Sequence, residues 1–151
     1  MKVRDFVSVA LFSVDVRKEV GDTVTIVGVI PDNVTAVSQN SVIPKLVIYV
    51  RSLVAMTDKP LSKMIIRFVS PSEDVLAEQT IDEDEMNRIT EVFREQESPV
   101  ATILSEFTIQ NFSLKDVGRY FVTSEYNGKE YLAGHLKVKQ AKAANSKDAQ
   151  N

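Results

Sequence analysis

The strongest constraint on this chain is the recurrence of β-branched residues in alternating runs along nearly its whole length. Valine, isoleucine and threonine make up 41 of the 151 residues, and such side chains fit a pleated sheet better than a helix. Turn sequences such as Pro31-Asp32-Asn33 and Asn127-Gly128 separate the runs. Eight strands are predicted, at about residues 6–16, 23–30, 45–56, 63–69, 75–80, 102–112, 119–126 and 129–138. Their spacing predicts an all-β sandwich of seven or eight strands.

One segment departs from this pattern and predicts an inserted amphipathic α-helix at about residues 82–97. Asp82 is a good N-cap residue, and Glu85 follows it at the position that completes a capping box. Ser98-Pro99 ends the run. The apolar residues predicted to share one side of the helix are Met86, Ile89, Val92 and Phe93.

A short motif near the C-terminus specifies the type of sandwich. Asp116, Gly118 and Tyr120 form an Asp-x-Gly-x-Tyr pattern, which resembles the start of strand F in immunoglobulin-like sandwiches, where the tyrosine hydroxyl bonds to nearby backbone. Val122 stands where an antibody domain has its second cysteine. The resemblance implies an immunoglobulin-like sandwich outside the true antibody domains, and it implies no ligand.

The hairpin that follows this motif can adopt two registers, because Asn127-Gly128 suits a two-residue turn or a turn with a glycine bulge. The bulged turn pairs Glu125 with Lys129 and buries Leu132 opposite Val122. It leaves Tyr131 and His135 facing outward, so that His135 is a surface residue and not a catalytic one. This register is preferred because it places Tyr120, Val122, Leu132, Leu136 and Val138 on one buried side.

Three segments follow one another in a recognisable order: residues 9–16 leading into 25–30, residues 43–51, and the Gly118-Arg119-Tyr120 strand with its Asn-Gly hairpin. In this order most of the chain resembles a family of small bacterial and phage-type proteins known only as a domain of unknown function. The resemblance implies an all-β sandwich and carries over no catalytic residues. The helix at 82–97 is an addition to the family pattern.

Composition excludes several kinds of chemistry. The chain has no cysteine and a single histidine, so it offers no disulfide, thiolate or histidine-cluster metal site. A formal charge of −3 argues against nucleic-acid binding. No nucleophile elbow or phosphate-binding glycine loop is present. We therefore expect no enzymatic activity, catalytic residue, metal or cofactor.

The domain organisation is predicted to be simple. Residues 1–139 form a single sandwich domain, and residues 140–151, which lack any large apolar side chain, form a disordered tail. No apolar run approaches the roughly 18 residues of a membrane span, and the first residues lack a cleavage site of the kind that follows a signal peptide. With no cysteine present, a cytoplasmic protein is expected.

The predicted strands at residues 6–14, 24–30 and 45–56 are apolar on both sides, whereas a two-layer sandwich should present polar residues outward. Something must cover the second side: the helix at 82–97, another protein chain, or both together, since one four-turn helix is too short to cover a whole sheet. The second possibility predicts a homo-oligomer, most simply a dimer. The residues expected at its interface are Val47, Tyr49 and Leu53, or else Val7, Val9 and Leu11.

Two functions of different class remain open. The first is a non-enzymatic module that binds protein and self-associates. The alternative is a protein of bacterial or phage origin that binds or sequesters a small nucleotide-like ligand. The basic residues expected to face phosphate in that case are Arg51, Lys63, Arg67 and Arg119.

Overall fold

The computed structural model describes residues 4–21 and 23–142 and confirms a mostly β architecture in two sheets. The elements in chain order are β1 (Phe6–Lys18), β2 (Val24–Ile30), β3 (Asn33–Ala36), β4 (Val42–Ala55), β5 (Met64–Val69), β6 (Val75–Ile81), α1 (Glu83–Glu95), β7 (Val100–Ser113), β8 (Gly118–Tyr126) and β9 (Lys129–Gln140). The described residues thus contain nine strands, one more than predicted. The additional strand is β3, whose four residues are too few to show alternation. Within the same residues, no helix has the length and apolarity needed to cross a membrane.

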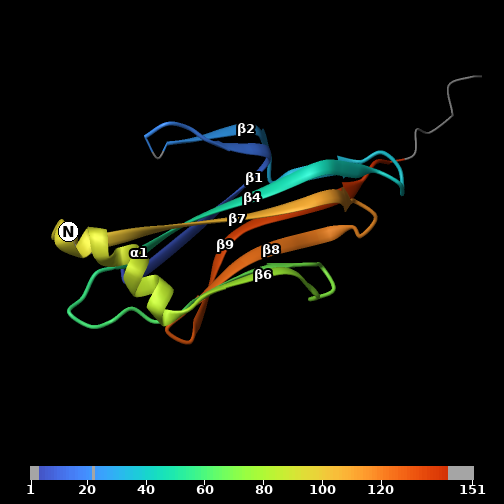
Figure 1. The fold of residues 1–151 in the computed structure, drawn as a ribbon. Helices are drawn as coiled ribbons and strands as arrows, with labels where there is room; N and C mark the ends of the chain where they lie inside the picture. The colour runs from blue at the N-terminus through green and yellow to red at the C-terminus, as the bar shows by residue number, and fades with distance from the viewer. Residues whose placement is uncertain (1–3, 22, 143–151) are drawn as a thin grey trace, which may run out of the picture.

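The strands form a four-stranded sheet in the order β2-β1-β4-β7 and a five-stranded sheet in the order β3-β9-β8-β5-β6 (Figure 1). Every pairing is antiparallel except that of β3 with β9. This parallel pairing continues past the predicted domain end, because Gln140 pairs with Ala36 and the Ala141 amide donates to the Ala36 carbonyl. Residues 143–151 of the predicted tail lie outside the described residues.

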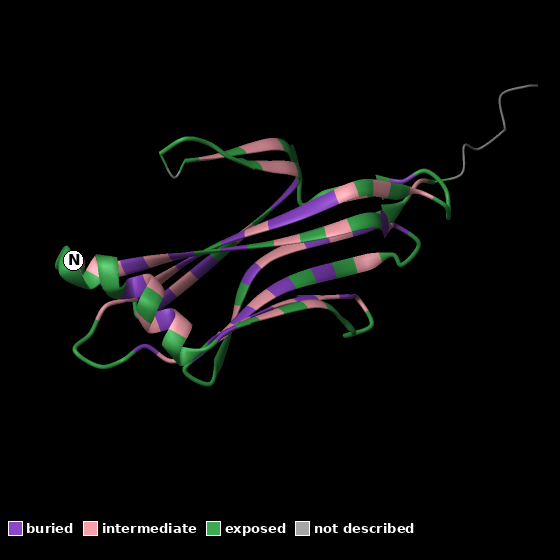
Figure 2. Cartoon of the chain, in the orientation of Figure 1, coloured by how far each residue is buried: buried purple, intermediate pink, exposed green. Residues whose placement is uncertain are grey.

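The core lies between the facing sides of the two sheets, and burial alternates along the strands accordingly (Figure 2). Its centre is aromatic: Phe68 packs against Phe12, Phe112 and Tyr120, with ring centroids 5.7 to 6.2 Å apart. Burial of large rings contributes strongly to the stability of such a core. The Tyr120 hydroxyl donates to the Asp116 carbonyl at 3.0 Å, as the Asp-x-Gly-x-Tyr motif predicts.

The β8–β9 hairpin has the register of a two-residue turn, and not that of the bulged turn expected from the sequence. Tyr126 pairs with Lys129, and Asn127 and Gly128 both have positive φ, which is typical of a two-residue type I′ turn. The bulged-turn prediction is therefore wrong. Leu132 faces outward and is 60% exposed.

The irregularity in this hairpin lies farther from the turn. Thr123 pairs with Leu132 while Val122 pairs with Gly134, so that Ala133 is an extra residue in β9. This bulge returns Leu136 and Val138 to the core side. Its position has a steric reason, because a Cβ on Gly134 would lie 3.1 Å from the Ala10 Cβ, and β1 approaches β9 closely here.

Of the two aromatic residues expected to face outward, His135 does so and Tyr131 does not. Tyr131 instead packs against the Phe6 ring, with centroids 4.8 Å apart. His135 pairs with Phe121, which is 36% exposed on the outward-facing side of the five-stranded sheet.

The helix α1 begins at the predicted N-cap, but it does not pack across the outward-facing side of a sheet. The Asp82 side chain accepts a hydrogen bond from the Glu85 amide at 2.8 Å, and Met86 is fully buried. Val92 is 48% exposed, whereas Thr90, unpredicted, is buried and donates to the Met86 carbonyl. Because α1 joins β6 and β7, the edge strands of the two sheets, it lies at one end of the sandwich (Figure 1). It therefore does not cover the outward-facing side of the four-stranded sheet.

The β1–β2 hairpin extends beyond the sandwich. β1 pairs with β4 only as far as Ser13, whereas it pairs with β2 as far as Lys18. Residues 14–18 and 24–28 therefore form a two-stranded ribbon, which we call the arm. In Figure 1 the arm stands apart from the strands below it.

Three buried serines form a polar link across the core. The Ser8 hydroxyl lies 3.0 Å from the Ser52 hydroxyl and 2.9 Å from that of Ser124. Ser8 and Ser52 belong to the four-stranded sheet and Ser124 to the other. The cluster satisfies hydroxyls that would otherwise be buried without partners.

We expect Ser8→Ala to destabilise the fold by about 1–3 kcal/mol, because it removes the shared partner of two buried hydroxyls. The triple variant with alanine at positions 8, 52 and 124 should lose less stability than this single variant, since no hydroxyl is then left unpaired. Urea denaturation measures both differences. A triple variant less stable than Ser8→Ala would contradict this account.

Candidate functional site

The outward-facing side of the four-stranded sheet carries a hollow with mainly apolar walls. Three cross-strand pairs of β1 and β4 stand in a row here: Val7 with Leu53, Val9 with Arg51, and Leu11 with Tyr49. These six residues line a hollow of about 270 Å³, which we call the trough. Val9 is 52% exposed and Leu11 is 41% exposed. A contiguous exposed apolar surface is typical of an interaction site.

Five of the six interface residues predicted from the sequence line the trough, and the sixth does not. Val47 faces the same side but is only 1% exposed, and its cross-strand partner Ser13 is fully buried. Asp15 in the arm bonds to Lys45, two residues from Val47 on the same side. The base of the arm therefore covers Val47, which is not accessible to another chain.

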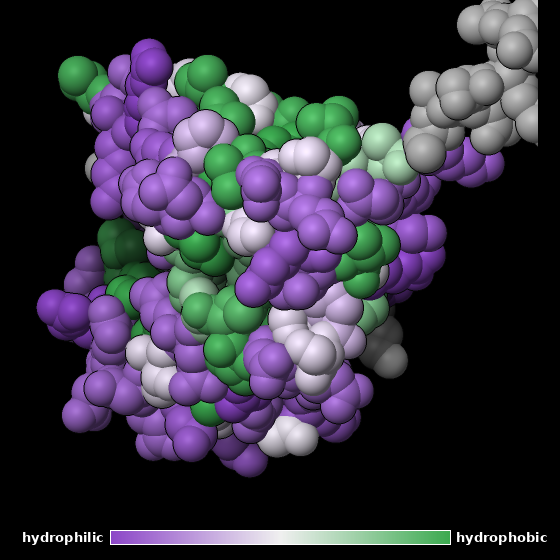
Figure 3. Space-filling view, turned by 90° about the vertical axis from the view of Figure 1, so that its right-hand side faces the viewer, coloured by the Kyte–Doolittle hydropathy of each residue, from purple (hydrophilic) through white to green (hydrophobic). Residues whose placement is uncertain are grey.

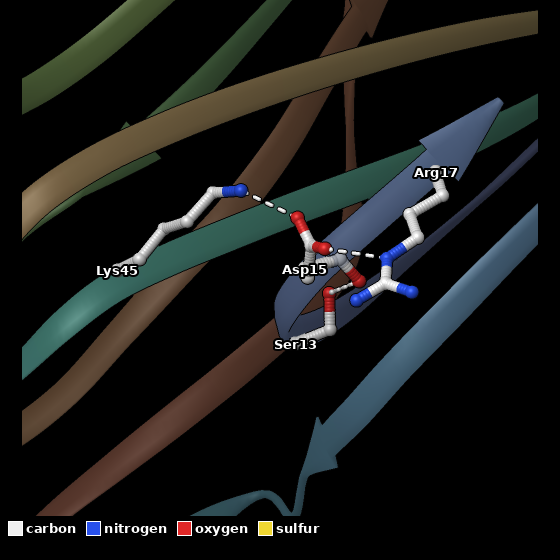
Figure 4. A network of polar contacts seen from close by, with 4 residues as sticks. All are labelled: Ser13, Asp15, Arg17 and Lys45. Atoms are coloured by element: carbon white, nitrogen blue, oxygen red, sulfur yellow. Dashed lines mark hydrogen bonds and ion pairs between the residues drawn. The ribbon is translucent and has the colours of Figure 1, made fainter.

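The base of the arm is held by a small ionic network (Figure 4). The Asp15 carboxylate accepts hydrogen bonds from the Lys45 ammonium and, at 2.9 Å, from the Arg17 guanidinium. Lys45 belongs to β4, so its bond ties the arm to the body of the sheet. The Ser13 hydroxyl donates to the Asp15 carbonyl at 3.4 Å.

This network lowers the pKa of Asp15 from 3.8 to about 2, through the hydrogen bonds from Lys45 and then Arg17. The folded-state pKa lies below the unfolded value, so the ion pairs stabilise the fold fully above pH 3.8. That contribution is lost as the pH falls towards 2. The arm therefore stays tied to β4 at neutral pH.

We expect Asp15→Asn to accelerate hydrogen exchange in the arm at neutral pH, because the tie to β4 becomes weaker. The melting temperature should change by less than about 2 °C, since an exposed ion pair contributes little to global stability. Exchange measured by mass spectrometry should show this effect shrinking as the pH approaches 2. Asp58→Asn, in the β4–β5 loop, is the control and should leave arm exchange unchanged.

The structure does not bring together the four basic residues expected to face phosphate. Arg51 lies in the trough, whereas Arg67 and Arg119 belong to strands of the five-stranded sheet and Lys63 directly precedes one. Lys63 lies beside the end of β8 at Tyr126. Arg119 is seven residues back along β8, roughly 24 Å from that point.

Arg67 is already engaged within the chain. Its guanidinium donates to the Glu78 carboxylate at 2.7 Å and to the Glu125 carboxylate at 2.9 Å. The hydrogen bonds to Glu125 and then Glu78 raise the pKa of Arg67 above its ordinary value. Arg67 therefore ties β6, β5 and β8 together across the sheet.

A second hollow, of about 280 Å³, lies at the end of the sandwich opposite α1. Leu76, Ile109, Phe112 and Tyr120 supply its apolar walls, and Ser70 and Asp116 are among its polar ones. Figure 3 views the molecule from this end and shows hydrophobic side chains among more numerous hydrophilic ones. Sequence patterns did not predict this hollow, because its walls come from four separate segments of the chain.

Sequence reasoning also missed Leu104 and the role of the arm. Leu104 pairs with Arg51 and is 49% exposed, so it extends the apolar surface onto β7. Strand 102–112 was predicted, but its alternation did not reveal which side faces outward. The arm could not be foreseen because its separation depends on where β1 stops pairing with β4.

No protein-family model matches the chain, and no curated protein is similar to it in sequence. Among the described residues, no group of three or more histidine, cysteine or acidic side chains is placed to hold a metal ion.

Proposed function

We propose that this protein is a non-enzymatic interaction module that self-associates as a dimer through the trough. The observation that carries the proposal is the trough itself, in which cross-strand pairs of apolar side chains remain exposed on the outward-facing side of a sheet. The helix that was an alternative cover lies at the end of the sandwich. A closed two-fold pair would bury the apolar surface without forming a filament.

We further propose that the sandwich is of the immunoglobulin-like type. The tyrosine hydroxyl bonded to the Asp116 carbonyl supports this assignment, since this contact is a feature of strand F. The parallel pairing of β3 with β9 agrees with it. In such domains the loops and sheets commonly bind protein. The lack of cysteine in this chain supports a cytoplasmic location.

A binding role also fits the way the chain uses its polar groups. Arg67 ties three strands together, and the buried serines bond to one another. These groups have structural partners and stand away from the trough. The resemblance to small bacterial and phage-type proteins of unknown function remains a prediction and is compatible with this role.

Light scattering at micromolar concentration tests the proposal. The wild-type chain should have twice the monomer mass of 16.9 kDa. Tyr49→Asp should weaken association by about 30-fold or more, because it places a carboxylate in an apolar contact. Phe121→Asp changes an aromatic residue on the other sheet and should leave the dimer intact. A wild-type mass of one chain would overturn the proposal.

A further inference from the structure

The arm has an apolar surface that its own chain leaves exposed. β2 reads Val24-Thr-Ile-Val-Gly-Val-Ile30, with no charged residue in seven positions. Val14, in the arm, is 41% exposed, and Val20, in the turn of the arm, is 99% exposed. A two-stranded ribbon is marginally stable in water unless it packs against another layer.

The arm does not pack tightly onto its own sheet. Val16, Lys18 and Val24 face Tyr49 and Leu104 across a hollow of about 290 Å³. This hollow adjoins the trough, since Tyr49 lines both. The arm and the sheet thus leave an unfilled space between them, with apolar walls beside Tyr49 and polar walls that include Gln79 and Glu106.

The charges of the arm and the sheet are complementary. Lys18 and Glu19 lie at the end of the arm, and Arg51 and Glu106 lie on the outward-facing side of the sheet. Within residues 4–21 and 23–142, none of these four side chains forms an ion pair. Lys18 and Glu106 line the same hollow without forming an ion pair in their own chain, so each stays available to a charge on a second chain.

We propose that the occupant of the trough is the arm of a second copy of this chain, exchanged reciprocally between the two protomers. This inference rests on the proposed self-association and names the segment that makes the contact. Val20 of each copy enters the space beside Tyr49 of the other, and Lys18 of each copy pairs with Glu106 of the other. Exchange of identical arms closes the pair and buries both exposed apolar surfaces.

Val20→Asp tests the arm directly, because an almost fully exposed side chain is not needed for folding of the monomer. We expect this variant to weaken dimer formation by about tenfold or more in analytical ultracentrifugation. Val37→Asp is the matched control, since Val37 is also highly exposed, at 82%, but lies outside the arm. It should associate as wild type does.

If Val20→Asp dimerises as tightly as wild type while Tyr49→Asp does not, the arm inference fails and the proposed function stands. If wild type is monomeric, the proposed function fails, and this inference fails with it. Circular dichroism of each variant should match wild type, so that a loss of association is not a loss of fold.

A mixing experiment tests whether the charge contact runs between chains. Lys18→Glu and Glu106→Lys each place like charges in both contacts of a homodimer, whereas a heterodimer of the two variants has opposite charges in both. We expect the mixture to associate about three- to fivefold more tightly than either variant alone, in line with exposed ion pairs. The preference should weaken at high salt. Equal affinity in the mixture and in the separate variants would overturn the proposed pairing of Lys18 with Glu106.

Discussion

The change of pairing partner along β1, from β4 to β2, determines the two main surface features of this molecule, the trough and the arm. Its first half pairs with β4 and its second half with β2, so that one strand belongs to the sandwich and to the arm. The first half presents Val7, Val9 and Leu11 outward, and the second half carries the arm away from them. The trough and the arm are thus two results of one change of hydrogen-bonding partner.

The interior is held together by side-chain packing and hydrogen bonds between the two sheets. Between the sheets, aromatic packing is combined with a hydroxyl cluster that crosses the layers at Ser8, Ser52 and Ser124. Where β1 approaches β9, a Cβ on Gly134 would lie 3.1 Å from the Ala10 Cβ, and the bulge at Ala133 lies beside that approach. Close contact between the two sheets is therefore achieved with small residues, without the disulfide and tryptophan of antibody domains.

Alternation and turn chemistry were sufficient to predict eight strands and the start of the helix, because these signals are local. They failed where the outcome depends on distant segments. The bulge at Ala133 lies where Gly134 meets Ala10, and the burial of Val47 follows from Asp15 reaching Lys45. The apolar side of β1 and β4 was recognised from sequence, but its cover was not, since the position of α1 is fixed by the edge strands it connects.

Gly28 shows how the direction of the arm can be specified separately from the sandwich. It has φ of 62°, and a Cβ at this position would lie 2.4 Å from a methyl carbon of Val14. Neither residue belongs to the core cluster. The angle at which the arm leaves the body is therefore encoded by two surface positions, and changes there can reorient the arm while the packing between the sheets is preserved.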